Sequence, residues 1–250
     1  IDRIIGGLEK RSKIISASEK KTIAYHEAGH ALVSWLVEFA SPLVKVSIVP
    51  RGQSLGAAWY LPEERQITTT EQLVDEMCAA LGGRAAEEVM FNKISTGALS
   101  DLEKVTKQAY AMVTVYGLNP RIGNRSYYDS TGDQSFTKPY SEETSRIIDE
   151  EVSLLIEGAY DRAKEILRTN KEKLVGLADS LLENEVIFKE DLLRILGKRP
   201  FASVEEIVPL APVKAPPIEA SSSGVIVEDT PVSTDSKGSD LEEGDGKEGT

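Results

Sequence analysis

The stretch AYHEAGHALVSW, residues 24–35, holds the only two histidines of the 250-residue chain. His26 and His30 stand four residues apart, and Glu27 directly follows the first of them. Residues four apart lie on one face of an α-helix, one turn from each other, so both imidazoles can bind one metal ion. Glu27 points about a quarter turn away, beside the metal rather than onto it. The H-E-x-x-H pattern therefore predicts a zinc site with Glu27 as the general base.

A simpler interpretation is that both histidines are core residues, which is the commoner role of a single histidine on an apolar face. The complete pattern is more specific, because it arises by chance in about one chain in a hundred or fewer at this length. Zinc also suits the hydrolysis of an amide, since it polarises the carbonyl and lowers the pKa of bound water from about 15.7 towards 7. Proton transfer by Glu27 would add about 10²- to 10⁴-fold.

The sequence around the motif predicts a helix that carries it. Ser16 and Glu19 have the spacing of a capping box just before an apolar stripe that runs from about residue 18 to residue 40. Ser41 and Pro42 follow and would end the helix. The motif thus lies in the helical context that its chemistry requires.

Two extended segments follow, residues 43–50 and 55–62, and predict a small antiparallel pair of strands. In the first segment the alternation places Val44, Val46 and Ile48 on one side of the strand.

The rest of the body is predicted to be helical. Thr68 and Glu71 form a second possible capping box, and the apolar face behind them continues to about Phe91. A long loop without periodicity is expected at residues 118–140. The further predicted helices cover residues 99–116, 142–168, 171–184 and 189–196. The expected fold class is mainly α, with a small antiparallel β element and a disordered acidic tail.

The net charge of -12 is spread unevenly along the chain. Residues 201–250 carry 11 Asp and Glu against 3 Lys and Arg, whereas residues 1–200 carry 30 against 26. The nearly balanced body lacks the basic stripe that phosphate binding requires, which argues against nucleic acid as a partner. The tail is rich in Pro, Ser, Gly and acidic residues and should be disordered. The single cysteine, Cys78, lies among apolar residues and is expected to be buried.

A catalytic zinc usually has three protein ligands and an open position, so the two histidines leave one ligand to find. Without a third histidine, a carboxylate is the expected donor, and the candidates on later helices are Glu87, Glu88 and Asp101. Spacing alone does not choose among them. Asp101 would also be explained by its place in the first turn of a helix, and Glu87 by a salt bridge or a solvated face.

Several motifs, in order, resemble the peptidase half of FtsH, the membrane-anchored AAA+ zinc metalloprotease. The resemblance covers approximately residues 1–201. The motifs are IIGGLEK, AYHEAGHALV, VSIVPRG, LGAAWYLPEER, LGGRAAEEV, STGALSDLEKVTKQAYAMV and YGL. The resemblance implies that His26, His30 and Asp101 bind one zinc per chain, that Glu27 is the base, and that Glu87 lies nearby without ligating.

The resemblance also implies an organisation for the chain. Residues 1–15 are expected to be the junction that follows an AAA+ module, residues 16–200 the zinc metallopeptidase domain, and residues 201–250 the acidic tail. The chain has no P-loop pattern, so ATP is expected to act only in the full-length protein. The family further implies a homo-hexamer, a membrane anchor, and substrates that are unfolded or misassembled polypeptides. The motifs look bacterial, which implies the cytoplasmic side of the inner membrane, with a mitochondrial or chloroplast membrane as the alternative.

Two other functions remain compatible with parts of the sequence. A non-catalytic, ring-forming scaffold of the same family would be expected to have lost His26, Glu27 or His30, and all three are present. A zinc amidase that acts on small substrates would need the same ligands. The predicted strand pair favours a peptide instead, because a strand edge can hold an extended substrate by backbone hydrogen bonds.

Overall fold

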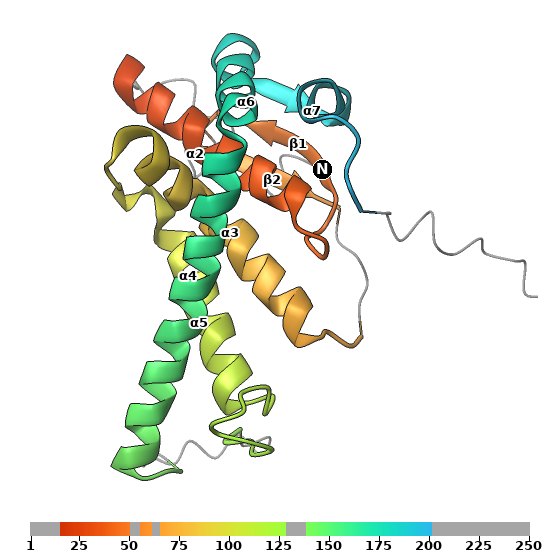
Figure 1. Cartoon of the computed structure of the whole chain (residues 1–250). Coiled ribbons are helices and arrows are strands. Elements are labelled where there is room, and N and C mark those ends of the chain that lie inside the picture. The colour runs from red at the N-terminus through yellow and green to blue at the C-terminus, as the bar shows by residue number, and fades with distance from the viewer. Residues whose placement is uncertain (1–15, 51–55, 62–65, 129–138, 202–250) are drawn as a thin grey trace, which may run out of the picture. The chain divides into compact units, whose positions relative to one another are not determined.

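A computed structural model describes residues 16–50, 56–61, 66–128 and 139–201 (Figure 1), all within one compact unit, Ile1–Val208. Helices dominate this unit, and a three-stranded antiparallel sheet completes it, so the predicted fold class is confirmed. The helices are α2 (Ala17–Leu36), α3 (Thr70–Phe91), α4 (Leu99–Thr114), α5 (Glu142–Thr169), α6 (Lys171–Asn184) and α7 (Lys189–Leu196). The strands are β1 (Leu43–Ser47), β2 (Ala57–Tyr60) and β3 (Val186–Phe188), and a 3-10 turn, η1 (Thr96–Ala98), precedes α4.

The helix that carries the H-E-x-x-H motif, α2, begins at the predicted capping box. The Ser16 hydroxyl accepts the N–H of Glu19 at 3.2 Å, and the Glu19 carboxylate accepts the N–H of Ser16 at 2.9 Å. These two bonds satisfy donors that the first turn of a helix leaves unpaired. The local sequence was therefore sufficient to place the start of α2.

The end of α2 lies at Leu36, so the prediction of a helix up to about residue 40 is wrong. Distant side chains hold the segment 37–40 outside the helix. Arg199 Nη2 donates to three carbonyl oxygens of this segment at 2.8 to 3.0 Å, and Asp75 accepts one of its backbone N–H groups at 2.9 Å. Because both partners are far away in the sequence, the local apolar pattern could not reveal this ending.

Helices α2 and α3 approach each other backbone to backbone. A Cβ added to Gly29 would lie 2.3 Å from the carbonyl oxygen of Gly82, and one added to Gly82 would lie 2.7 Å from that of Gly29. Such distances leave no room for a side chain at either position. The small residues next to the two histidines thus bring α3 directly against the motif.

The predicted strand pair is present, with β2, β1 and β3 in that order across the sheet. The prediction that Val44 faces the same side as Val46 and Ile48 is wrong, because Val44 is 43% exposed whereas the other two are buried. A register shift between Leu43 and Lys45 changes the alternation at this point. Strand β3 was not predicted, since three residues are too few for a period-two pattern.

The N-terminus of α3 differs from its prediction by one residue. The capping box is formed by Thr69 and Gln72, not by Thr68 and Glu71. The Gln72 side chain accepts the N–H of Thr69 at 2.8 Å, and the Thr69 hydroxyl accepts the N–H of Gln72 at 3.4 Å. Glutamine serves this role as glutamate does, so the sequence offered two adjacent pairs with the same spacing.

The later helices agree with their predicted ranges to within two residues. Helix α4 ends at Thr114 rather than at 116, and Gly117 follows with φ of 64°, as a left-handed turn after a helix requires. Ser141 caps α5 as expected, by accepting the N–H of Thr144 at 3.2 Å. Helix α5 is the longest, and α3 and α4 pack along it (Figure 1).

The surface and the core fit a folded globular unit. Cys78 is fully buried as predicted, and burial raises the pKa of its thiol to about 12.

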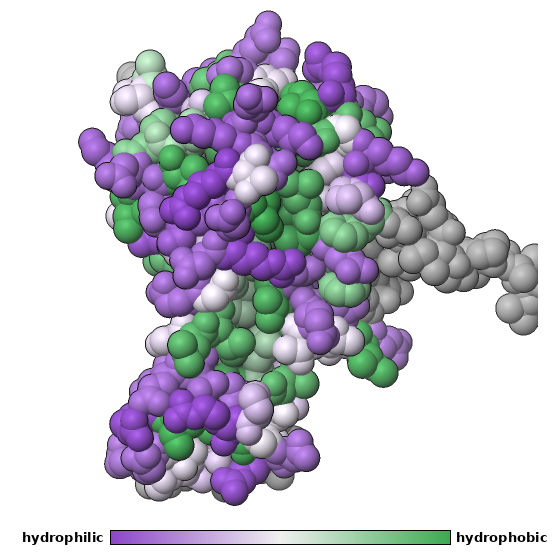
Figure 2. Space-filling view, viewed as in Figure 1, coloured by the Kyte–Doolittle hydropathy of each residue, from purple (hydrophilic) through white to green (hydrophobic). Residues whose placement is uncertain are grey.

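On the face shown in Figure 2, polar residues cover most of the surface and apolar residues form separate patches. None of the helices in the described ranges combines the length and the apolar character that crossing a bilayer demands. The expected junction at residues 1–15 and the expected disorder of residues 202–250 lie outside the described residues.

Candidate metal centre

Three side chains from two helices converge on one point in the interior. The Nε2 atoms of His26 and His30 are 3.1 Å apart, and an oxygen of Asp101 lies 3.4 Å from the first and 3.5 Å from the second. Both histidines are buried and Asp101 is partly buried. In the described part of the chain, this is the one group of three or more His, Cys, Asp or Glu residues whose ligand atoms are close enough to hold a metal ion.

Asp101 reaches this point because the chain turns tightly before α4. Glu87 Oε2 accepts the N–H of Ser95 at 2.7 Å, and the Ser95 hydroxyl accepts the N–H of Gly97 at 3.1 Å. These bonds fix the 3-10 turn η1 against α3, and α4 starts directly after it. Asp101 then lies in the first turn of α4, with its carboxylate directed at the two imidazoles.

The second nitrogen of each imidazole also has a partner. His26 Nδ1 lies 2.7 Å from a carboxylate oxygen of Glu87, and His30 Nδ1 lies 2.9 Å from the backbone carbonyl of Ala79. Because both partners are acceptors, each Nδ1 carries a proton, so in the neutral form of each ring the lone pair lies on Nε2 and faces the centre. A metal-binding histidine is held in this way in most proteins.

The other two candidate carboxylates point away from the centre. Glu87 uses one oxygen for His26 and the other for the backbone of Ser95. Glu88 accepts a hydrogen bond from the Tyr160 hydroxyl on α5 at 2.5 Å. The geometry therefore brings Asp101, and not Glu87 or Glu88, to the two Nε2 atoms.

A glycine leaves the space in front of the Nε2 atoms open. A Cβ added to Gly83 would lie 2.5 Å from Nε2 of His26 and 2.5 Å from Nε2 of His30. Two imidazole nitrogens and one carboxylate oxygen are also a donor set that zinc accepts. The residues present therefore fit a zinc ion, in their chemistry and in the space between them.

Glu27 lies beside this centre and lines the same cavity, which has a volume of about 500 Å³. Its side chain is buried, and the backbone of Gly56 lies directly against it, since a Cβ there would be 2.5 Å from Glu27 Oε1. Burial raises the pKa of Glu27, although the two nearby histidines partly oppose this effect. A carboxyl with a raised pKa is suited to accept and return a proton near neutral pH.

The charges of the centre are coupled. Burial disfavours the protonated form of His26, but contacts with Asp101 and Glu87 outweigh burial and raise the pKa of His26 to about 10. Burial favours the neutral form of Asp101, yet the two imidazoles hold the pKa of this carboxyl well below its usual range. A proton and a divalent cation would compete for the same lone pair, so metal binding here should depend on pH.

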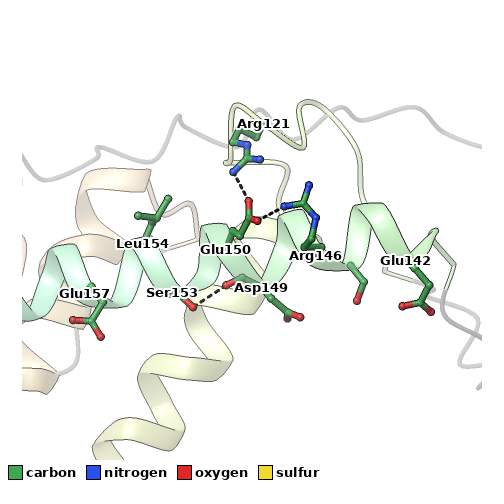
Figure 3. Close-up of a pocket in the computed structure, with 9 residues that line it drawn as sticks. Arg121, Glu142, Arg146, Asp149, Glu150, Ser153, Leu154 and Glu157 are labelled. Atoms are coloured by element: carbon green, nitrogen blue, oxygen red, sulfur yellow. Dashed lines mark hydrogen bonds and ion pairs between the residues drawn. The ribbon is translucent and has the colours of Figure 1, made fainter.

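A second hollow, with a volume of about 820 Å³, lies on the outer face of α5 (Figure 3). Its charged side chains largely pair with one another: Arg121 and Arg146 both contact Glu150. No histidine or cysteine lines it. This hollow is larger than the one at the centre, but among the described residues it contains no group of ligand atoms close enough to hold a metal ion, and its Ser153 hydroxyl donates to the backbone carbonyl of Asp149.

Sequence reasoning missed two residues that line the inner cavity. Tyr60 closes it from β2, and its hydroxyl lies 3.1 Å from that of Ser34 on α2. Lys104 lines it from α4, one turn after Asp101. Tyr60 gave no local signal, because only the fold brings β2 over α2. The three-residue spacing from Asp101 could have drawn attention to Lys104.

A helix that carries H-E-x-x-H, joined by a carboxylate from the start of another helix, defines the chain as a zinc metallopeptidase by class. Comparisons with known proteins specify this class further. Residues 13–195 match the model of peptidase family M41. The chain is 65% identical over 204 residues to the ATP-dependent zinc metalloprotease FtsH of Parabacteroides distasonis, a match that covers 81% of this chain and 30% of that protein.

Eukaryotic relatives match the same part of the chain. The ATP-dependent zinc metalloprotease FTSH 3, mitochondrial, of Arabidopsis thaliana is 53% identical over 206 residues, which cover 82% of this chain and 26% of that protein. The mitochondrial inner membrane m-AAA protease component AFG3L2 of Mus musculus is 50% identical over 212 residues, which cover 83% of this chain and 26% of that protein.

The chain belongs to peptidase family M41, as the peptidase domain of an FtsH-type protein, and membership implies zinc as the metal. It spans less than a third of the length of these relatives.

Proposed function

We propose that this chain is a zinc-dependent endopeptidase in which His26, His30 and Asp101 hold one zinc ion and Glu27 is the general base. The observation that carries the proposal is the convergence of the two Nε2 atoms and the Asp101 carboxylate on the space that Gly83 leaves open. Zinc bound there would supply a Lewis acid that polarises the peptide carbonyl and acidifies water.

Glu27 then performs the proton transfers. Its carboxylate takes a proton from the attacking water and delivers it to the amine that leaves when the peptide bond breaks. Burial and the raised pKa support this role, because a carboxyl of higher basicity accepts a proton more readily. Gly56 holds the side chain from the opposite side and limits the positions it can take.

Glu87 has a supporting role in this proposal. Its hydrogen bond to His26 Nδ1 fixes the tautomer and the ring orientation of that ligand. Its second oxygen anchors Ser95, at the beginning of the turn that leads to Asp101. One buried carboxylate thus positions two of the three proposed ligands.

The substrate is proposed to bind as an extended strand along β2. Strand β2 is the outer strand of the sheet, and the described residues place no strand on its free side. Ala57, Ala58 and Tyr60 of this strand line the cavity next to Glu27. Backbone pairing with this edge would hold polypeptides of many sequences, which suits unfolded proteins as the substrate class.

Zinc analysis of the purified 250-residue chain, combined with cleavage of unfolded casein with and without a chelator, tests the proposal. We expect one zinc per chain and cleavage that stops on chelation and returns with added zinc. A folded chain that binds no zinc and leaves casein intact would refute it.

The relatives' names support a wider proposal for the whole protein. We propose that this chain is the peptidase part of an ATP-dependent, membrane-anchored homo-hexamer that degrades unfolded or misassembled proteins. ATP would act only in the full-length protein. The bacterial relative at 65% identity favours the inner membrane, with the peptidase part on the cytoplasmic side, and a mitochondrial or chloroplast membrane is the alternative. Mass photometry of the full-length protein should show six copies, and a stable monomer would contradict this assembly.

A further inference from the structure

The charged groups that line the inner cavity are mostly acidic. Beside the two histidines, Glu27, Glu76 and Asp101 contribute carboxylates, and Lys104 is the one lysine or arginine among the described residues that line the cavity. In the proposed site zinc offsets the charge of Asp101, so Glu27 and Glu76 are the carboxylates whose negative charge a substrate side chain meets. Lys104 is positively charged, so its position determines where an acidic side chain of the substrate can bind.

Lys104 lies close to the proposed reaction centre. It follows Asp101 by three residues on α4, which corresponds to about 4.5 Å along the helix axis. An extended peptide advances about 3.3 Å per residue. The ammonium group of Lys104 can thus reach a substrate side chain only within about three residues of the bond that is cleaved.

The ammonium group is not occupied by another side chain. Within the described ranges, the ammonium group of Lys104 forms no ion pair or hydrogen bond. Its neighbour on the same helix, Lys107, pairs with Glu103 instead. Lys104 is exposed and lines the cavity, so its positive charge is available to a substrate.

Residues of α3 line the same cavity as Lys104. Ala79 and Ala80 line it with small side chains. Glu76, one turn before them, accepts a hydrogen bond from Gln108 Nε2 at 3.3 Å, which holds its carboxylate on α3. The cavity has a volume of about 500 Å³, so a substrate side chain can enter it, and Lys104 is among the residues it can meet there.

We infer that Lys104 is a specificity-determining residue that binds the carboxylate of an Asp or Glu side chain of the substrate at a single position near the cleaved bond. The inference rests on the proposed peptidase function and names a substrate class for it: polypeptides with one acidic residue in this subsite. At other positions in the cavity, the carboxylates of Glu27 and Glu76, which hold no metal in the proposed site, disfavour an acidic residue by repulsion. The preference is thus specific to position rather than a general affinity for acidic chains.

Pairs of quenched fluorescent peptides test this inference. Each pair carries Glu or its neutral isostere Gln at one of the three positions on either side of the cleaved bond. The readout is the ratio of kcat/KM for the two peptides, at low and at high salt. The wild-type chain should prefer Glu at one position by about twofold to fivefold, the range expected for a partly exposed ion pair, and the preference should shrink with salt.

Variants assign the preference to Lys104. In Lys104→Met the Glu-to-Gln ratio at that position should fall to one or below, and in Lys104→Glu a Lys-containing peptide should be preferred over a Glu-containing one. Lys107→Met is the matched control, since Lys107 is 75% exposed, points to Glu103 and does not line the cavity. It should leave both the rate and the ratio unchanged.

A binding measurement separates this inference from the peptidase proposal. The affinities of the same peptides for the Glu27→Gln variant, measured by fluorescence anisotropy, report the Glu-to-Gln ratio without cleavage. A ratio that depends on Lys104 supports the inference even if the wild-type chain cleaves nothing, which would refute the peptidase proposal alone. A ratio of one at every position, or a preference that survives in Lys104→Met, overturns the inference.

Discussion

The inner cavity between α2, α3 and α4 and the outer hollow on α5 are both rich in charged residues, but they use charge differently. On α5, arginines and glutamates neutralise one another in pairs. In the inner cavity, two imidazoles and a carboxylate meet at one point, and no arginine in the described ranges pairs with that carboxylate. The outer hollow is the larger of the two. The difference teaches that unmatched ligand groups, rather than the size of a hollow, mark the reactive site.

Filling the open space at the centre should have the largest effect. Gly83→Ala places a methyl group 2.5 Å from both Nε2 atoms, so we expect zinc binding and peptide cleavage to be lost together. Gly158→Ala on α5 is the matched control, because nothing lies within 4 Å of the added Cβ there. The control should keep full zinc and should raise the free energy of unfolding by up to about 1 kcal/mol. Normal zinc content in Gly83→Ala would contradict the proposed position of the metal.

Removing the base should separate chemistry from metal binding. Glu27→Gln should lower kcat by about 10²- to 10⁴-fold while one zinc per chain remains bound. The same substitution in the outer hollow, Glu150→Gln, should leave kcat unchanged. Peptide hydrolysis and zinc content measured on both variants provide the comparison. Wild-type kcat in Glu27→Gln would remove Glu27 from its proposed role.

The two carboxylates next to His26 should differ in their effect on zinc affinity. Glu87→Gln keeps the shape of the side chain but weakens the bond to Nδ1, and a loss of about 10- to 100-fold in affinity is expected. Asp101→Asn removes a proposed ligand and should cost more. Competition with a chromophoric zinc chelator measures both affinities. If Asp101→Asn retained wild-type affinity while Glu87→Gln lost zinc, Glu87 would take the place of Asp101 as the third ligand.

Protonation should also distinguish the two regions in the metal-free chain. The pKa of His26 is raised to about 10 by Asp101 and Glu87 against the effect of burial, compared with 6.5 for a free imidazole. A raised pKa gives stability that is complete below about pH 6.5 and is lost as pH rises towards 10. Thermal unfolding with chelator present should therefore show a Tm that falls over this range.

The paired arginines and glutamates on α5 do not change charge between pH 6.5 and 10, so they add no such slope. Glu87→Gln should make the fall in Tm smaller, because one of the two partners that raise the pKa of His26 is then neutral. A Tm that stays constant or rises with pH in the metal-free wild-type chain would show that His26 is not protonated in this way.

The smallest effect is expected in the outer hollow. Arg146→Met removes contacts with Glu143 and Glu150, but all three side chains are well exposed and water screens their charges. Tm should change little, any change should vanish at high salt, and zinc content and kcat should be those of the wild type. A large loss of cleavage would mean that the outer hollow has a part in the reaction after all.

Local sequence predicted most of the helices and the histidine pair, because these features depend on residues close together in the chain. The capping box at Ser16 and the start of α5 after Ser141 are decided within a few residues, and both are present as expected. The H-E-x-x-H spacing likewise fixes the relative positions of His26 and His30 once the helix forms.

Features that depend on distant residues were missed or left open. The end of α2 is determined by Arg199 and Asp75, which the pattern around residue 40 does not contain. The choice among Glu87, Glu88 and Asp101 depends on how α3, α4 and α5 pack. The resemblance to a known family predicted Asp101 as the third ligand, and the structure brings its carboxylate to the two Nε2 atoms.

X-ray diffraction at the zinc absorption edge, on crystals of the 250-residue chain grown with zinc, tests the central claim most directly. We expect one anomalous peak per chain, about 2.0 to 2.1 Å from Nε2 of both His26 and His30 and bonded to a carboxylate oxygen of Asp101. A fully occupied zinc elsewhere, or an empty space between these three side chains, would contradict it.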